Sequence, residues 1–99
     1  MQVSNSYQYM ASVMKALAHP TRLFIVEMLN EQSHNVSELT QRVGADISTV
    51  SKHLMVLKQA GIISATKLNN QMIYSLLCPC VLDMFKCVVK IKETGKGND

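Results

Sequence analysis

The chain has 99 residues, of which 47% are hydrophobic and 17% charged, a composition that predicts one folded domain and excludes a disordered chain. Ten Lys and Arg against seven Asp and Glu give a formal net charge of +3, which permits a nucleic-acid partner without requiring one. The sequence has no run of about 18 apolar residues, and its start lacks the basic and apolar regions of a signal peptide. We therefore expect a single cytoplasmic domain over residues 1–99, with no membrane partner.

Two helices are predicted in the first third of the chain. Apolar residues recur at helical spacing within residues 6–18 and indicate the first helix. These residues are Met10, Val13, Met14 and Leu17. Pro20 suits the first turn of a second helix, which we expect His19 to cap and which reaches about Glu31. Because this second helix is apolar on most sides, it is expected to lie at the centre of the domain.

A helix-turn-helix is predicted over residues 36–60. Asn35 followed by Glu38 is typical of a capping box at the start of its first helix. Asp46 is expected to cap its second helix, and Gly61 stands where a left-handed residue ends that helix. Two short helices joined by a tight turn that contains glycine are typical of this motif.

The period of the hydrophobic residues then changes from 3.6 to 2, which predicts a β-hairpin over residues 62–77. Asn69 and Asn70 tolerate the positive φ of a two-residue type I′ turn at its tip. A strongly apolar helix follows over residues 79–92, and residues 93–99 are expected to form a frayed tail. The predicted fold class is mainly α with a small β-hairpin, in which the hairpin is the wing of a winged helix-turn-helix.

The helix predicted over residues 47–59 is the candidate DNA-recognition helix. Polar side chains near its start are expected to reach base edges in the major groove. These side chains are Ser48, Thr49, Ser51, Lys52 and His53. Phosphate and wing contacts are expected from Arg42, Lys67, Asn69 and Asn70. The alternative is an ordinary solvated helix face with solubilising charge.

Surplus apolar surface on the two terminal helices predicts a homodimer, because one small core cannot cover all of their apolar positions. The helices are those over residues 6–18 and 79–92. A two-fold dimer places its recognition helices about 34 Å apart, so the partner DNA is expected to be an imperfect palindrome. The alternative is that both helices pack entirely within one chain.

Three segments together resemble the ArsR/SmtB family of bacterial winged-helix repressors. They read KALAHPTRLFIVEML, NVSELTQRVGADISTVSKHLMVLKQAGII and QMIYSL, and the resemblance covers roughly residues 12–77. It implies a homodimeric repressor that binds double-stranded operator DNA and releases it when a metal, metalloid or oxidant occupies a sensor site. Ile47 departs from the family, which often has Gln at this position. The cysteines and the carboxylate/His pairs of the family's common metal sites are also absent here.

Cys78, Cys80 and Cys87 are the remaining sensor candidates. Three thiolates without a fourth ligand suit a soft three-coordinate effector, so we expect As(III) or Sb(III) as the effector and no permanent cofactor. On one straight helix Cys80 and Cys87 would stand about 10.5 Å apart, so the site needs a bend or the partner's Cys87. One alternative is a redox or reactive-sulfur sensor that forms a disulfide or polysulfide at the same cysteines. Another is that the three thiols are buried packing residues.

An enzyme is not expected. Cys-Pro-Cys has one residue between its thiols, whereas redox motifs normally have two and lie near a βαβ unit. The sequence also lacks a glycine-rich phosphate loop, a Ser/His/Asp grouping and paired carboxylates.

Overall fold

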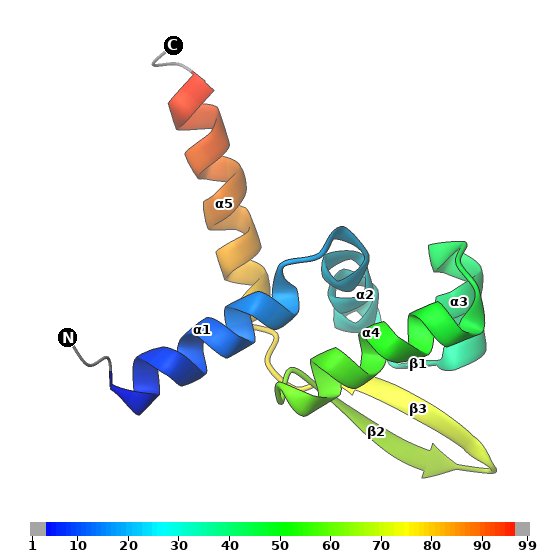
Figure 1. Cartoon of the computed structure of the whole chain (residues 1–99). Coiled ribbons are helices and arrows are strands. Elements are labelled where there is room, and N and C mark those ends of the chain that lie inside the picture. Colours follow the sequence, from blue (N-terminus) through cyan, green and yellow to red (C-terminus); the bar gives the residue numbers. More distant parts are fainter. Residues whose placement is uncertain (1–3, 97–99) are drawn as a thin grey trace.

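The computed structural model describes residues 4–96, which form five helices and three short strands (Figure 1). In chain order these are α1 (Asn5–Leu17), α2 (Pro20–Glu31), β1 (His34–Asn35), α3 (Val36–Val43), α4 (Ile47–Gln59), β2 (Ile63–Leu68), β3 (Gln71–Leu76) and α5 (Val81–Lys96). The predicted order of two helices, a helix-turn-helix, a hairpin and a last helix is confirmed. None of the helices described is long and apolar enough to cross a membrane.

The last helix is longer than the sequence predicted. We expected it to end at residue 92, but α5 continues to Lys96, so residues 93–96 are helical and not part of a frayed tail. The glycine at position 95 costs the helix only about 1 kcal/mol relative to alanine, and no proline follows to end the helix. Residues 97–99 of the expected tail lie outside the described residues.

Side-chain caps fix where α2 and α3 begin. His19 Nδ1 accepts a hydrogen bond from the backbone N–H of Thr21 at 3.1 Å, as expected for the residue before Pro20. Asn35 and Glu38 form the predicted capping box. The Asn35 side chain accepts from the Glu38 backbone at 2.8 Å, and the Glu38 side chain accepts from the Asn35 backbone at 3.0 Å. These caps satisfy backbone donors that a helix start leaves unpaired.

The α2 helix lies at the centre of the domain, as predicted. Its buried residues are Ile25, Val26, Met28 and Leu29. Buried residues from the surrounding elements pack with them to complete the core: Ala16, Leu17, Leu39, Val50, Leu54, Leu57, Ile62 and Ile63.

The hairpin formed by β2 and β3, residues 63–76, is the wing. Leu68 pairs with Gln71 across its tip, so the turn consists of Asn69 and Asn70. Their φ angles are 50° and 65°, and a type I′ turn requires positive φ at both central residues. The predicted turn is therefore confirmed.

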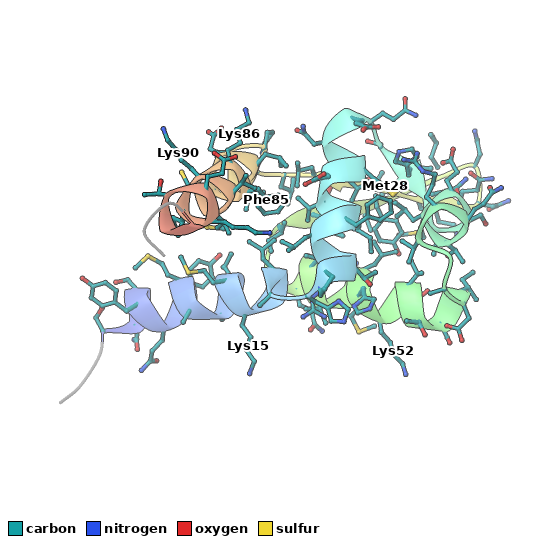
Figure 2. The ribbon with its side chains drawn as sticks, turned by 90° about the horizontal axis from the view of Figure 1, so that it is seen from above. Lys15, Met28, Lys52, Phe85, Lys86 and Lys90 are labelled. Atoms are coloured by element: carbon teal, nitrogen blue, oxygen red, sulfur yellow. The ribbon has the colours of Figure 1, made fainter. Side chains whose placement is uncertain are left out.

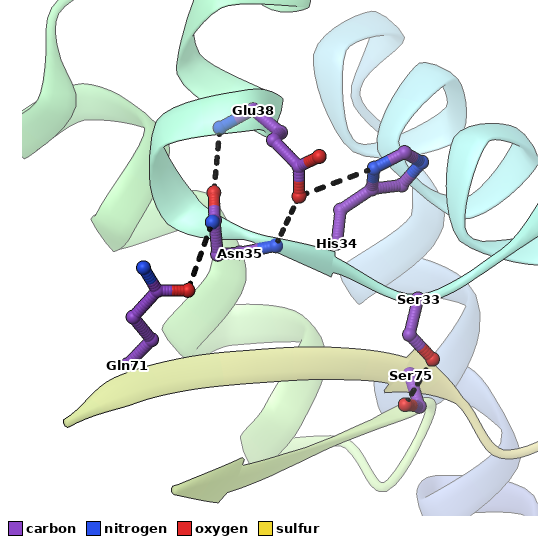
Figure 3. A network of polar contacts seen from close by, with 6 residues as sticks. All are labelled: Ser33, His34, Asn35, Glu38, Gln71 and Ser75. Atoms are coloured by element: carbon purple, nitrogen blue, oxygen red, sulfur yellow. Dashed lines mark hydrogen bonds and ion pairs between the residues drawn. The ribbon is translucent and has the colours of Figure 1, made fainter. Parts of the chain in front are cut away.

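A third strand that the sequence did not predict joins the wing to the start of α3. β1 pairs antiparallel with β3, which gives a sheet of order β1–β3–β2. Figure 3 shows two side-chain bonds across this junction: Ser33 Oγ to Ser75 Oγ at 2.6 Å, and Asn35 Nδ2 to Gln71 Oε1 at 3.2 Å. The wing is thus anchored to the helix-turn-helix by backbone and side-chain contacts.

The two terminal helices carry apolar side chains that the core does not cover. The start of α5 packs on the core, and the rest of the helix projects away from the domain (Figure 1). Exposed apolar residues on α5 are Val88, Val89 and Ile91, and those on α1 are Tyr7, Tyr9, Met10 and Met14. The expected surplus of apolar surface is present on both helices.

Candidate nucleic-acid interface

The α4 helix separates an enclosed apolar face from an exposed polar one. Val50, Leu54 and Leu57 are at most 1% exposed and pack in the core. Four of the expected DNA-contacting residues are exposed: Ser48, Thr49, Ser51 and Lys52. Lys52 points away from the body of the domain (Figure 2). The predicted outward placement of these four side chains agrees with their exposure, and their contact with DNA stays a prediction.

Asp46 holds the start of α4. Its Oδ1 accepts a hydrogen bond from the backbone N–H of Thr49 at 3.0 Å. Hydrogen bonds from Thr49, first from its side chain and then from its backbone, lower the pKa of the Asp46 carboxyl. The carboxylate is therefore ionised at neutral pH and complements the positive end of the helix.

His53 is placed differently from the expectation. We predicted it on the outward face, but it is half-buried and packs against His19, with 4.4 Å between ring centroids. Its Nδ1 lies 3.2 Å from Nη1 of Arg22, whose Nε donates to the carbonyl oxygen of Ala16. The reason is its position next to Leu54 on the edge of the buried face. His53 ties α4 to the start of α2 and is not part of the outward surface.

The environment of His53 favours the neutral imidazole. Burial lowers its pKa, and electrostatic interactions with His19 and Arg22 lower it further. Because a guanidinium only donates, the nitrogen facing Arg22 serves as the acceptor of this contact.

The wing tip and the start of α3 meet beside α4. A cavity of about 330 Å³ lies between these three elements. Ser37 of α3, Ser51 of α4 and Asn70 and Gln71 of the wing are among the residues that line it. Hydrogen-bonding side chains from all three elements therefore share one surface.

Three further expected residues lie on α3 and on the wing. Arg42 lies in the last turn of α3, Lys67 lies on β2, and Asn69 lies in the turn of the wing. All three are exposed, as a contact to a phosphate requires.

Lys15 was not among the expected interface residues. It lies on α1, and it projects to the same side of the domain as Lys52 (Figure 2). Lys86 and Lys90 of α5 project to the opposite side. No sequence signal marks Lys15, because its position relative to α4 depends on how the two helices pack.

The three cysteines do not come together within one protomer. All three are exposed in the single protomer, so they do not pack in its core. Cys78 and Cys80 line a mostly apolar cavity of about 370 Å³ with Tyr9 and Met84, whereas Cys87 lines a different one. Within residues 4–96, no three His, Cys, Asp or Glu side chains gather closely enough to hold a metal ion. A three-thiol site confined to one chain is therefore not formed, because Cys80 directly precedes α5 and Cys87 lies about two turns along that regular helix.

Comparison with known sequences places the middle of the chain in a described family. Residues 19–65 match the family described as "Bacterial regulatory protein, arsR family". An HTH-type transcriptional regulator of Mycobacterium tuberculosis (strain ATCC 25618 / H37Rv), Rv0081, is 37% identical over 86 residues, which are 86% of this chain and 75% of the relative. A biofilm growth-associated repressor of Xylella fastidiosa (strain Temecula1) is 38% identical over 66 residues, or 67% of this chain and 58% of that repressor.

Comparison with solved structures extends the similarity to almost the whole fold. The crystal structure of M. tuberculosis Rv0081 has a TM-score of 0.81 at 33% identity and covers 97% of both chains. The repressor BigR from X. fastidiosa has a TM-score of 0.74 at 30% identity, over 86% of this chain and 87% of that one.

Proposed function

Because the chain belongs to the arsR family of bacterial regulatory proteins, whose members are DNA-binding transcriptional regulators and not enzymes, we propose that it is a homodimeric repressor of the ArsR/SmtB type. In this proposal α4 enters the major groove of a palindromic operator and the wing contacts the flanking backbone. A thiophilic effector at the C-terminal cysteines then releases the DNA.

The observation that best supports DNA binding is that α4, α3 and the wing share one surface. Hydroxyl, amide and ammonium groups from these elements face outward together, and these groups bond to base edges and phosphates. Lys52 and Lys15 add positive charge on one side (Figure 2). The charge is modest, so we expect a low-to-moderate operator affinity that falls clearly as salt is added.

The homodimer is supported by the uncovered apolar side chains of α1 and α5. Val88, Val89 and Ile91 are each more than half exposed, on a helix that projects from the domain. Burying such a face against a second copy removes its apolar area from water, which stabilises the association. A two-fold axis there gives two recognition helices and hence a palindromic operator.

The proposed effector is As(III) or Sb(III). Cys78 and Cys80 line one cavity, whereas Cys87 lies further along α5. A site with three thiolate ligands therefore requires that the partner protomer contribute one of them. The relatives named above do not favour the redox alternative. A hundredfold loss of DNA affinity on effector binding requires about 2.7 kcal/mol of coupling between the two sites.

The test is fluorescence anisotropy of the reduced protein with labelled duplexes selected from a randomised library. We expect one palindromic sequence to bind with two protomers per duplex, and its affinity to fall linearly with salt on logarithmic axes. Binding with no sequence preference, or binding with a salt slope near zero, contradicts the proposal. A scrambled duplex of equal length is the control.

A further inference from the structure

Ile47 is an exposed apolar side chain at the first position of the proposed recognition helix. Its side chain is 54% exposed, although α4 is otherwise polar on its outward face near this end. The placement therefore calls for a reason outside local folding.

The local structure does not use Ile47. Asp46 and Thr49 make the cap of α4. The apolar residues that flank this cap and pack in the core are Val50, which is buried, and Ala45, which is half-buried. Ile47 is not part of the core that they join. Neither the cap nor the core is the reason for an isoleucine at this position.

The neighbours of Ile47 are the residues proposed to face DNA. Ser48 follows it in the chain, and Ser51 lies one turn later on the same side of the helix, where it lines the cavity beside the wing. The first residues of a recognition helix are the ones that reach base edges. If α4 enters the major groove as proposed, Ile47 reaches the floor of the groove first.

We infer that Ile47 is a specificity-determining residue that reads the 5-methyl group of a thymine in each operator half-site. The thymine methyl is the apolar group that B-DNA presents in the major groove, and isoleucine has no side-chain donor or acceptor with which to read another base. Serine hydroxyls can bond to several bases, so Ser48 and Ser51 discriminate less. This inference rests on the proposed function, because it requires α4 to lie in the groove.

The experiment replaces each thymine of the selected operator by deoxyuridine, which removes only the 5-methyl group. With the natural protein, we expect one position per half-site at which this replacement weakens binding about fourfold, the effect of one methyl group no longer removed from water. Ile47→Ala is expected to weaken binding to the thymine operator and to lose the response to deoxyuridine at that position. Ile47→Val keeps the branched side chain and is expected to retain most of the response.

Met55→Ala is the matched control. Met55 is an equally exposed apolar residue of α4, but it lies about 12 Å further along the helix axis. This variant is expected to keep the full response to deoxyuridine. A selected operator with no position sensitive to the methyl group, or an unchanged sensitivity in Ile47→Ala, overturns the inference while DNA binding itself stands. Failure of the natural protein to select any duplex overturns the proposed function and the inference with it.

Discussion

Arg22 Nη1 lies 3.2 Å from Nδ1 of His53, and this contact joins the start of α2 to the proposed recognition helix. The ring of His19 packs against the ring of His53, with 4.4 Å between the two centroids and an angle of 50° between the two planes. Two imidazoles and a guanidinium therefore meet at the point where α1, α2 and α4 converge. The contact needs a neutral His53, because a protonated imidazole has no acceptor to offer to the guanidinium.

Acidification should destabilise the fold through His53. Its pKa in the folded protein is lowered from 6.5, mainly by burial and then by His19 and Arg22. Between this lowered pKa and 6.5 the unfolded chain binds more protons, so the stability rises with pH in that window and is fully present above 6.5. Urea unfolding from about pH 5 to about pH 8 measures the effect. His53→Gln should flatten the dependence, and an unchanged slope in this variant would show that other groups cause it.

The turn of the wing should depend on Asn70. Its φ of 65° is a conformation that L-residues other than Asn and Asp adopt at a cost of about 1 kcal/mol. We expect Asn70→Ala to lower the free energy of unfolding by about that amount, and Asn70→Gly to leave it unchanged or slightly higher. Equal losses in both variants would indicate that the side chain, and not the backbone angle, is what matters. Urea denaturation distinguishes the two.

Lys52 should contribute to DNA affinity mainly through charge. Lys52→Gln is expected to weaken operator binding and to make the logarithmic salt slope less steep by about 1 per protomer. Lys86→Gln is the matched control, since Lys86 is exposed but projects to the other side of the domain (Figure 2). Anisotropy titrations at several salt concentrations measure both. Equal changes in the two variants would mean that net charge, rather than position, sets the affinity.

A charge in the exposed apolar face of α5 should disrupt the dimer. Val88 is 59% exposed in the single chain, so Val88→Asp leaves the protomer core intact. In a two-fold interface the change buries unpaired carboxylates, and we expect the association to weaken by about 3 kcal/mol or more. Sedimentation velocity should show monomers at concentrations where the natural protein and Val88→Leu remain dimeric. A Val88→Asp dimer of unchanged affinity would exclude this face as the interface.

Arsenite should release the reduced protein from its operator, and this response should need Cys80. We expect release at about one equivalent per protomer, reversed by a dithiol. Cys80→Ser and Cys87→Ser should keep DNA affinity but lose the response. Met84→Leu changes the same cavity as Cys80 without removing a thiol and should respond normally. If arsenite released both serine variants at the same concentration as the natural protein, the effector site would not include these two cysteines.

Signals that act over a few residues made most of the fold predictable. The start of α3 is determined by the capping box of Asn35 and Glu38. The turn of the wing is determined by the positive φ angles that Asn69 and Asn70 tolerate. β1 escaped prediction because a strand of two residues is too short to show alternation. The side occupied by His53 depends on where α4 crosses the start of α2, which no short-range pattern encodes.

The candidate site was predictable to a similar extent. The exposed face of α4 follows from the spacing of Val50, Leu54 and Leu57, so Ser48 and Lys52 could be placed from sequence. The contribution of Lys15 could not, because it depends on the packing of α1 beside α4. The sequence indicated the separation of Cys87 from the other two thiols only through the length of the helix between them. Whether a thiol of the partner protomer completes the site depends on the geometry of the dimer.

The β1 strand restricts how such a protein can release DNA. The β1 pairing and the Ser33–Ser75 and Asn35–Gln71 hydrogen bonds join the wing to the start of α3 (Figure 3). Because α3 in turn packs against α4, we expect the wing and α4 to move together. In the proposed repressor, each protomer is then expected to bind and leave the duplex with its wing and recognition helix as one unit. In the proposed dimer, an effector at α5 would then act by changing the spacing or tilt of the two recognition helices. We therefore expect half-sites separated by a non-matching length to be rejected as strongly as half-sites of the wrong sequence.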